Sequence, residues 1–303
     1  MRRSFEIIGA PFGFAANTCG SNNAPSYLRQ HGLNTRIRQR IRSWDENIKD
    51  VGDILVENEM KELLEEKNII KAVELYCYKL HQCVLNSYIC GNTPIIIGGD
   101  HSISIGTISA TASYLTSYLN LKNLGILWVD AHADLNYLDK GNIHGKSAAI
   151  ALGYGNESLI KMAGVSPMIK PENLIYIGIR DLMPNEDIIM KSNKIQLYGM
   201  DKIDELGIHR VIKEAVKKLE DSTDGFFVSF DIDACDGGLY QGCSTPEAGG
   251  LTAREAIQIA YWAGKSSKLL GADIVEFSPE DDRLGNTGPL VIKLIDAILG
   301  YRM

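Results

Sequence analysis

A short apolar segment followed by three potential metal ligands is the feature that most restricts how this chain can fold. Residues 124–129 form the apolar run, which has the length of a buried strand. Asp130, His132 and Asp134 follow it at every second position. Because side chains alternate between the two faces of an extended chain, we expect these three to point the same way. Neighbouring carboxylates repel each other, so the spacing suits a divalent cation, although a polar turn with a capping Asp would give the same pattern.

Two other apolar segments end in the same kinds of residue. Residues 226–230 lead into Asp231 and Asp233. Residues 94–97 lead through Gly-Gly-Asp into His101. All three clusters fall where a parallel strand would leave its sheet, which is where open α/β sheets bind ligands. The six candidate metal ligands are His101, Asp130, His132, Asp134, Asp231 and Asp233. Two metal ions that share bridging carboxylates are the simplest arrangement for such a set, and its many oxygen atoms favour Mn²⁺ over zinc.

Apolar strands alternate with helical patterns along the whole chain. The expected strands are residues 5–10, 49–54, 95–97, 124–129, 174–178, 194–197, 226–230 and 272–277. The expected helices begin at residue 25 and then cover residues 57–90, 104–119, 147–152, 204–219, 252–263 and 289–299. This alternation predicts an α/β fold with a mostly parallel central sheet and helices on both faces. We find no linker or repeat and expect one domain, residues 1–303, in which the long loop 236–250 has a functional role.

The composition narrows the class of protein and its partners. The 303 residues carry a net charge of −7, which argues against a nucleic-acid partner, and the basic positions 36, 38, 40 and 42 are expected to form a solvated or interface segment. No apolar run approaches the roughly 18 residues that a membrane span needs, so no membrane partner is expected. The apolar start of the chain is expected to be a strand rather than a secretion signal. Six cysteines without a CxxC pair favour a reducing, cytoplasmic location, with Cys235 and Cys243 packing near the proposed site.

These clusters, together with further motifs in the same order, resemble the ureohydrolases, which include arginases, agmatinases, formiminoglutamases and guanidino-acid hydrolases. The three metal signatures are Gly-Gly-Asp-His-Ser at 98–102, Asp-Ala-His-Ala-Asp at 130–134 and Ser-Phe-Asp-Ile-Asp at 229–233. The further motifs are Gly-Asn-Ile-His-Gly at 141–145, Thr-Pro at 245–246 with Gly-Gly-Leu at 249–251, and Asp-Ile-Val-Glu at 273–276. The match extends from about Ile7 to the carboxyl end. Residues 106–109, 141–145 and 177–184 look more like arginases than agmatinases.

The resemblance implies a three-layer αβα fold around a binuclear manganese centre with two Mn²⁺ per chain. Asp130 and Asp231 would bridge the two ions. The other ligands would divide between the ions, His101 with Asp134 and His132 with Asp233. A hydroxide between the metals would be the nucleophile, because metal binding lowers the pKa of water toward neutrality. The resemblance also implies a homo-oligomer, a trimer or a hexamer, that acts on a small guanidino or amidino compound.

The resemblance also assigns residues to the substrate and the reaction. Glu276 would accept hydrogen bonds from the planar guanidinium in a fork-like contact. His144 would protonate the departing amine, a task that suits the near-neutral pKa of histidine. Asp134 is expected to take part in catalysis as well as in metal binding. The remaining substrate contacts would be Asn136, Asn142, Asp181 and Thr245.

The departures from the arginase pattern concern the substrate rather than the metals. Met183 stands where arginases carry an Asp that contacts the substrate α-amino group. Lys140 stands where they carry a Ser that helps to bind the α-carboxylate, and Lys146 with Ser147 replaces the residues that usually follow the His-Gly of the motif. A Met cannot accept a hydrogen bond from an ammonium group as a carboxylate does. Recognition of the α-amino group is therefore expected to be weakened or rerouted, and Lys140 or Lys146 could instead attract a carboxylate.

The leading hypothesis is a manganese-dependent hydrolase that converts L-arginine to L-ornithine and urea. The alternative within the same class is hydrolysis of agmatine, a guanidino acid or formiminoglutamate. An alternative of another class is a metal-binding homologue without catalytic activity. Loss of a ligand would favour that last reading, and all six ligand positions are retained.

Overall fold

The computed structural model describes residues 3–41, 47–138 and 140–301. Within these residues, one sheet of eight parallel strands runs in the order β2-β1-β3-β8-β7-β4-β5-β6. The strands are β1 Ser4–Ala10, β2 Ile48–Asp53, β3 Asn92–Gly98, β4 Leu124–Val129, β5 Leu174–Ile177, β6 Gln196–Tyr198, β7 Gly225–Asp231 and β8 Leu269–Val275. The expected parallel sheet is confirmed. Of the basic positions, Arg42 and the side chains of Arg38 and Arg40 lie outside the described residues.

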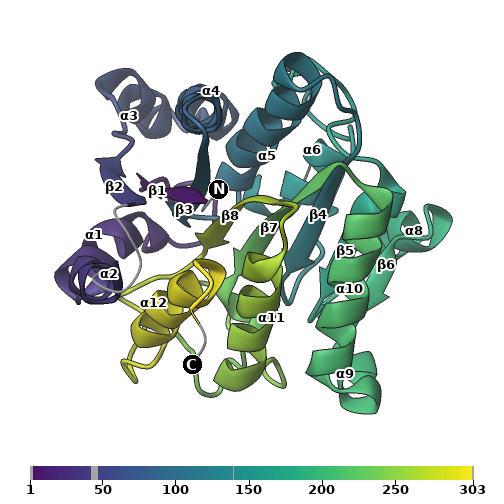
Figure 1. Cartoon of the computed structure of the whole chain (residues 1–303). Helices are drawn as coiled ribbons and strands as arrows, with labels where there is room; N and C mark the ends of the chain where they lie inside the picture. Colours follow the sequence, from purple (N-terminus) through teal and green to yellow (C-terminus); the bar gives the residue numbers. More distant parts are fainter. Residues whose placement is uncertain (1–2, 42–46, 139, 302–303) are drawn as a thin grey trace.

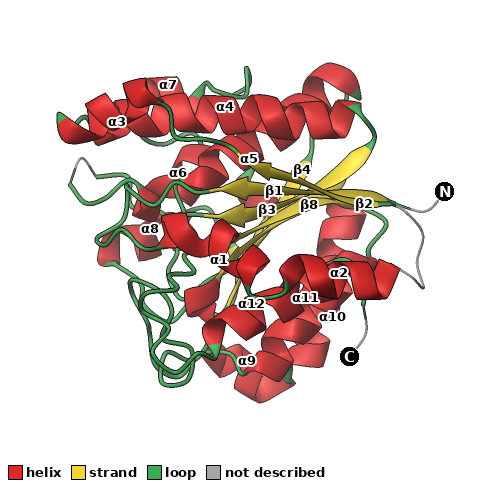
Figure 2. Cartoon of the chain, turned by 90° about the vertical axis from the view of Figure 1, so that its left-hand side faces the viewer, coloured by secondary structure: helices red, strands yellow, loops and turns green. Residues whose placement is uncertain are grey.

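Helices cover both faces of the sheet, which gives the three layers visible in Figure 2. One face carries α3 Asn58–Glu65, α4 Ile69–Ile89, α5 Ile103–Ser113 with its π-helical continuation η2 Tyr114–Tyr118, α6 Ser147–Ala151, α7 Glu157–Ile160 and α8 Pro184–Ser192. The other face carries α1 Ala24–Gln30, α2 Leu33–Ile41, α9 Met200–Leu206, α10 Ile208–Ser222, α11 Ala253–Lys265 and α12 Thr287–Ile298. Short 3₁₀ turns lie at η1 Ser21–Asn23, η3 His144–Lys146, η4 Pro171–Asn173 and η5 Ile232–Ala234. The expected α/β fold class is confirmed.

The central strands are buried on both faces, and their side chains supply two apolar layers. In β4, Leu127 and Val129 belong to the layer under α10, α11 and α12, whereas Ile126 and Trp128 belong to the layer under α4 and α5. This division follows the alternation of side chains along a strand. Every residue of β4 and β7 is buried, which explains why these segments are continuous apolar runs in the sequence.

The strand order brings distant parts of the chain to the same edge of the sheet. The four neighbouring strands β3, β8, β7 and β4 are far apart in sequence but adjacent in space (Figure 1). Because all of them are parallel, their carboxyl ends lie at one edge, where the long loops gather in Figure 2. The predicted metal signatures lie at the carboxyl ends of β3, β4 and β7: the first begins at the last residue of β3, the second follows β4 directly, and the third begins within β7. The topology therefore places the three signatures side by side.

Two helices that were expected to be continuous are each divided by a residue with positive φ. The segment 57–90 forms α3 and α4, separated at Lys67 with a φ of 58°. The Asn68 amide donates to the Leu63 carbonyl (2.8 Å). This hydrogen bond is typical of a helix that ends in a left-handed residue. The segment 204–219 belongs to α9 and α10, separated at Gly207 with a φ of 74°. Helical spacing of apolar residues continues across both breaks, so the spacing did not reveal them.

The strands lie where they were expected, with ends displaced by a few residues. β8 ends at Val275 rather than at residue 277, so Glu276 lies just beyond the strand. Helices α2, α7 and α8 were not expected. Helix α8 begins after Met183, whose amide donates to the Glu186 carboxylate (2.9 Å), a contact that stabilises a helix start.

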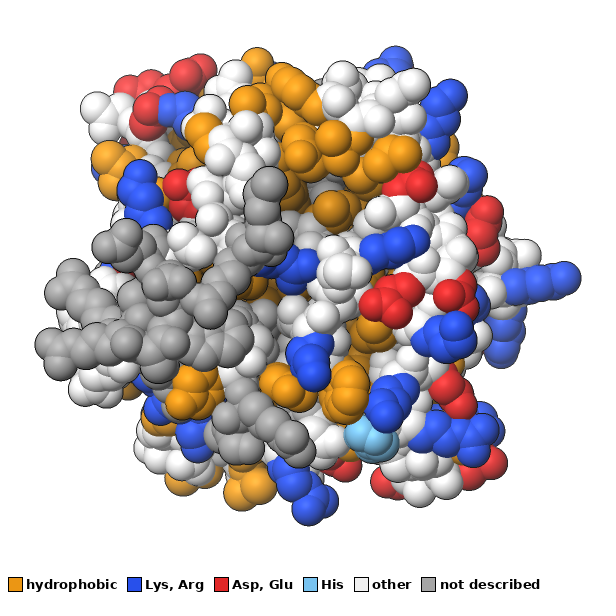
Figure 3. All heavy atoms as spheres, viewed as in Figure 1, with side chains coloured by type: hydrophobic (Ala, Val, Ile, Leu, Met, Phe, Trp, Pro, Cys, Tyr) orange, Lys and Arg blue, Asp and Glu red, His pale blue; other side chains and the backbone are white. Residues whose placement is uncertain are grey.

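None of the described helices is both long enough and apolar enough to cross a bilayer. On the face drawn in Figure 3, apolar side chains gather over α4 and α5, and side chains of both charges mix over α9 to α11. This face therefore carries interspersed charges rather than a continuous basic stripe.

Helices α4 and α5 approach each other closely at Gly106. A Cβ at this position would lie 2.8 Å from the Cys77 carbonyl oxygen and 3.1 Å from the Cys77 Cα. We expect Gly106→Ala to lower the free energy of unfolding by about 1–3 kcal/mol, because the two backbones must separate. Urea unfolding measures this change. The exposed Gln82→Ala on α4 is the control and should alter stability by less than about 0.5 kcal/mol. Since Ala is a better helix former than Gly by about 1 kcal/mol, a stabilised Gly106→Ala protein would contradict the packing argument.

Candidate functional site

A pocket of about 280 Å³ opens at the edge of the sheet where the strands end. Its lining residues follow β1, β4, β5, β7 and β8. They are Asn17, His132, Asp134, Asn136, His144, Gly145, Asp181, Met183, Glu186, Asp231, Asp233, Thr245 and Glu276. Four of the six predicted metal ligands are among them. The other two, His101 and Asp130, are buried against these four. The structure thus brings all six predicted ligands together.

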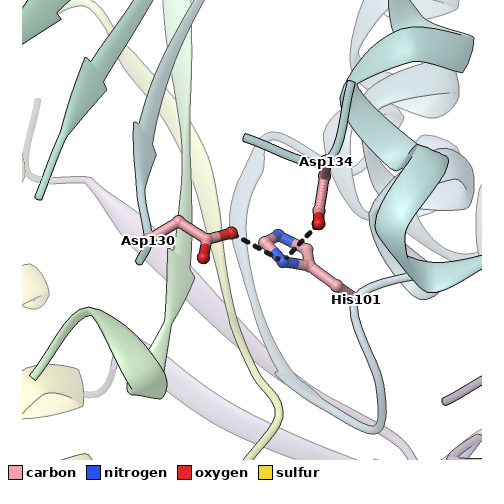
Figure 4. Close-up of side chains that lie close together, drawn as sticks. All are labelled: His101, Asp130 and Asp134. Carbon is pink, nitrogen blue, oxygen red and sulfur yellow. Dashed lines mark ion pairs between the residues drawn. The ribbon is translucent and has the colours of Figure 1, made fainter. Parts of the chain in front are cut away.

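His101 lies between three carboxylates. Its Nδ1 is 3.2 Å from Asp130 Oδ2, 3.0 Å from Asp134 Oδ2 and 3.0 Å from Asp231 Oδ2. Figure 4 shows the first two of these contacts converging on one nitrogen. Ligand atoms about 2.1 Å from a six-coordinate ion are about 3 Å apart when they lie at right angles. The measured separations therefore fit neighbouring ligands of one ion, and they equally fit ion pairs with a protonated imidazole.

A chain of hydrogen bonds determines which nitrogen of His101 faces these carboxylates. His101 Nε2 lies 2.8 Å from Ser229 Oγ, and Ser229 donates to the buried Asp273 carboxylate (2.7 Å). Because the single hydroxyl proton of Ser229 goes to Asp273, Ser229 accepts a hydrogen bond from the Nε2–H group, and in the neutral imidazole it is Nδ1 that carries the lone pair. Among the described residues, neither Nδ1 nor Asp134 Oδ2 has a hydrogen-bond partner. In the neutral imidazole this lone pair faces three carboxylate oxygens, an arrangement that fits a bound cation.

His132 belongs to a second group that adjoins the first. Its Nδ1 lies 2.9 Å from Asp233 Oδ2 and 3.6 Å from Asp130 Oδ1. Asp130 therefore directs one oxygen toward His101 and the other toward His132, as a bridging carboxylate would. The second oxygen of Asp231 accepts the Asp233 amide instead (2.8 Å). Asp130 thus directs its two oxygens at two different histidines, whereas Asp231 directs only one oxygen at a histidine.

The segment after β4 does not continue as an extended strand, so that expectation was wrong. The strand ends before Asp130, and the chain bends so that Asp130 Oδ1 accepts the His132 amide (2.7 Å). Asp134 has a φ of 50°, in the left-handed region that residues with a Cβ seldom adopt. Asp130 and Asp134 consequently face His101, whereas the His132 side chain faces Asp233. The turn, and not the alternation of a strand, brings these ligands together.

The charges of the two groups shift the pKa values of their members. Burial by itself lowers the pKa of His101 and of His132, but the surrounding carboxylates outweigh burial and raise both, that of His132 to about 12. Burial and the neighbouring carboxylates raise the pKa of Asp231 well above its usual range, and that of Asp233 to about 6. In the absence of a metal ion, bound protons therefore compensate the negative charge of the cluster.

Glu276 and His144 form an ion pair next to the first group. Glu276 Oε1 accepts the His101 backbone amide (2.8 Å) and lies 3.0 Å from His144 Nδ1. Glu276 has a φ of 63°, a conformation that persists only where the surroundings hold it. Burial by itself lowers the pKa of His144, but the hydrogen bond and the charge of Glu276 raise it to about 9. These two side chains therefore enter the pocket as an electrostatic pair, His144 from the turn η3 and Glu276 from the position directly after β8.

The predicted substrate residues do not all lie in the pocket. Asn136, Asp181 and Thr245 line it. The Thr245 hydroxyl also donates to the carboxylate of Asp233 (3.3 Å), a predicted metal ligand. Asn142 is not among the lining residues. Its side-chain amide donates to the side-chain oxygen of Asn17 (2.6 Å), and Asn17 does line the pocket. The structure thus places Asn142 behind Asn17 rather than at the pocket surface.

The departures from the arginase pattern affect one end of the pocket. Met183 lines it and is 55% exposed. Lys140 and Lys146 do not line it, and Lys146 Nζ donates to the Leu138 carbonyl (2.6 Å). A ligand in this pocket would therefore meet the Met183 side chain, whereas the two lysines do not form part of the pocket wall.

Sequence reasoning missed the side chains that support the ligands. The Trp128 indole donates to Asp130 (2.8 Å), and its ring stacks on His101 with centroids 4.4 Å apart. Asp273 was noticed only as part of a motif, and its link through Ser229 to His101 was not expected. The available signal was a polar residue inside an otherwise apolar strand, as at Ser229 in β7 and Asp273 in β8.

The two cysteines near the site have a packing role. Cys235 and Cys243 are buried in the apolar layer beneath the pocket. Burial raises the pKa of both thiols above the usual value, which makes them poor nucleophiles. The six cysteines of the chain are free thiols.

A sequence model of the arginase family matches residues 3–300 of this chain. The chain belongs to the arginase family. It is 34% identical to an arginase of Bacillus subtilis over 100% of both chains. It is 33% identical to an arginase of Staphylococcus aureus over 99% of this chain and 98% of that protein. The crystal structure of Bacillus subtilis arginase superimposes with a TM-score of 0.87 at 32% identity and covers 99% of this chain and 100% of that one.

Membership of the arginase family identifies the chain as a hydrolase that acts on guanidino or amidino groups. The resemblance to ureohydrolases inferred from the motifs is confirmed. Formimidoylglutamase of Bacillus subtilis has the same fold, with a TM-score of 0.79 at 23% identity. The roles of individual residues, the metal and the exact substrate remain predictions.

The protonated cluster predicts how the metal-free protein responds to pH. A group whose pKa is higher in the folded than in the unfolded state stabilises the fold below its unfolded pKa, and this contribution is lost as the pH rises toward the folded pKa. His101, His132 and His144 all have raised pKa values, those of His132 and His144 being about 12 and about 9. The melting temperature of EDTA-treated protein should therefore fall between pH 6.5 and pH 9.

The variant His132→Asn should show a shallower fall over the same pH range, because it lacks one of the three imidazoles. The control is His209→Asn, which removes an imidazole on α10 outside the cluster. A melting temperature that rises or stays constant between pH 6.5 and pH 9 in the wild-type protein would contradict the assignment.

Proposed function

We propose that this member of the arginase family is a manganese-dependent enzyme that hydrolyses L-arginine to L-ornithine and urea. The observation that carries the proposal is the convergence of four buried carboxylates and two imidazoles in adjoining groups, with Glu276 and His144 at the same pocket. The arginase relatives favour L-arginine. Met183 favours the alternative that the substrate is agmatine, a guanidino acid or formiminoglutamate.

Two Mn²⁺ ions per chain are the proposed cofactor. His101 and Asp134 would hold one ion and His132 and Asp233 the other, with Asp130 and Asp231 shared. The unpartnered His101 Nδ1 and Asp134 Oδ2 fit this assignment, because buried polar atoms normally have partners. When bound, such a pair of ions lowers the pKa of water and so supplies a nucleophile near neutral pH.

Glu276 is proposed to hold the substrate guanidinium. Its Oε1 already contacts the His101 amide and His144, whereas Oε2 has a long 3.5 Å contact with the Ser244 hydroxyl. A planar guanidinium can donate two parallel hydrogen bonds to one carboxylate. Because the Glu276 backbone amide donates to the Gly99 carbonyl (2.8 Å), this carboxylate is anchored next to the proposed metal ligands. The contact would orient the guanidinium carbon toward the nucleophile.

His144 is proposed to donate a proton to the departing amine. In the absence of a bound metal ion, burial lowers the pKa of His144, and the neighbouring carboxylates, Glu276 first, outweigh burial and raise it to about 9. A guanidinium that binds Glu276 competes with His144 for the same carboxylate. That competition weakens the interaction that raises the pKa of His144, and a less basic imidazolium is a better general acid.

Metal binding provides the first test of this proposal. We expect EDTA-treated protein to bind two Mn²⁺ per chain in a calorimetric titration, and its melting temperature to rise. Free metal at 100 times the dissociation constant stabilises a protein by about 2.7 kcal/mol. Asp130→Asn should lose both effects, because it removes the shared carboxylate. Asp204→Asn on the exposed side of α9 is the charge-matched control. Binding of two Mn²⁺ by Asp130→Asn would overturn the bridging assignment.

Product analysis provides the second test. We expect the manganese-loaded protein to release urea from at least one of L-arginine, agmatine and 4-guanidinobutyrate. Release of formamide from formiminoglutamate without urea from the other three would move the assignment to formiminoglutamase. His144→Asn should lower kcat by about 100-fold, the lower range for loss of a general acid, while the bound Mn²⁺ is retained. An unchanged kcat would remove His144 from the proposed reaction.

A further inference from the structure

Two carboxylates lie close together at the exposed side of the pocket, and one of them, Asp181, belongs to its wall. The side-chain ligand atoms of His132, Asp181 and Glu247 all lie within 4.8 Å of one another. The Asp181 side chain is 57% exposed, and Glu247 is half-buried. Asp181 and Met183 line the same pocket. Glu247 is not among the lining residues, but it adds a negative charge beside two residues of the wall, His132 and Asp181.

The backbone of Glu247 is held firmly in the loop 236–250. Its carbonyl accepts hydrogen bonds from Arg180 Nη2 (2.7 Å) and from the Gly237 amide (2.8 Å). A Cβ on Gly237 would lie 2.9 Å from the Glu247 backbone nitrogen and oxygen, so the two segments are in close contact. The Glu247 side chain consequently starts from a defined point beside Asp181.

Arg180 fixes this loop without neutralising its acidic side chains. All of its hydrogen bonds go to backbone carbonyl oxygens, including those of Asp233, Glu247 and Ala248. Among the described residues, no Lys or Arg side chain forms an ion pair with Asp181 or Glu247. The pair of carboxylates therefore remains available to a cationic group of a ligand.

The buried end of the pocket also offers a carboxylate to a cationic group. Glu276 is 3% exposed and lines the pocket, and it is not one of the six residues proposed to bind the metal ions. Carboxylates therefore lie both at the buried end and beside Asp181, an arrangement that suits a ligand with a positive charge at each end.

We propose that Glu247, together with Asp181, binds the ammonium group of the substrate and replaces the carboxylate that is absent at Met183. This inference rests on the proposed function, in which the guanidinium binds at Glu276. The substrate class is then a guanidino compound with a distal ammonium group, such as L-arginine or agmatine. A guanidino acid without an amine lacks the group that these carboxylates bind. Asp181 also lies 3.8 Å from His132, so Glu247 is the better residue with which to test ammonium binding alone.

The test compares two substrates that differ only in the ammonium group. Manganese-loaded wild-type and Glu247→Gln proteins are assayed for urea release from L-arginine and from 5-guanidinopentanoate, which lacks the α-amino group. We expect Glu247→Gln to raise the KM for L-arginine about tenfold, as expected for loss of a hydrogen bond to a charged group. The kcat for L-arginine and the KM for 5-guanidinopentanoate should change less than twofold.

Two further variants separate ammonium binding from a structural effect. Glu172→Gln removes the same charge from an exposed position before β5, at the opposite end of that strand from Asp181, and should leave both KM values unchanged. Met183→Asp in the Glu247→Gln background restores a carboxylate at the pocket wall and should return the KM for L-arginine to within about threefold of wild type. Equal KM changes for both substrates, or none, would overturn the proposal.

A binding measurement distinguishes failure of this inference from failure of the proposed function. Calorimetry on the manganese-loaded proteins compares L-ornithine with 5-aminopentanoate, which lacks the α-amino group. Weaker binding of L-ornithine by Glu247→Gln, with unchanged binding of 5-aminopentanoate, supports the ammonium site even if the wild-type protein releases no urea. If urea is released but both proteins bind L-ornithine equally, the ammonium site is wrong and the proposed function stands.

Discussion

Burial of several negative charges at one edge of a parallel sheet is the constraint on which the structure of the site depends. Asp130, Asp134, Asp231 and Asp233 are each at most 6% exposed and lie in two adjoining groups. The removal of a carboxylate from water costs several kcal/mol unless opposite charge accompanies it. Two imidazoles lie among these carboxylates, and protons on them supply that charge when no metal ion is present. Proton uptake, metal binding and folding stability therefore all depend on how the negative charge of this cluster is compensated.

The order of the strands explains how such distant residues meet. Because β3, β8, β7 and β4 are neighbours, the loops that follow them leave the sheet side by side. The amide of His101 consequently bonds Glu276, which lies 175 residues further along the chain. Positive φ values at Asp134 and Glu276 then turn both carboxylates into positions that a regular strand would not give them. The strand order thus brings these residues close together, and the two positive-φ conformations determine where the carboxylates of Asp134 and Glu276 point.

The residues proposed for the reaction and those proposed for substrate choice lie at different depths of the pocket. The four carboxylates proposed as metal ligands are nearly fully buried, whereas Asp181 and Met183 are more than half exposed. His132 joins the two sets, because its ligand atom lies within 4.8 Å of Asp181 and Glu247. In the proposed arrangement, Glu247 makes the contact with the substrate that Met183 cannot make.

The alternation of strands and helices and the identity of the six potential ligands were determined by the sequence alone, because both are local patterns of apolar and polar residues. The turn at Asp130–Asp134 and the helix break at Lys67 were not, because a left-handed residue leaves no mark in apolar spacing. Only the tertiary structure decided that Ser229 and Asp273 support His101, and that Glu247 of the loop 236–250 lies beside Asp181. These contacts join segments whose approach depends on the strand order, and the order of strands in a sheet is not encoded in the local pattern of any one of them.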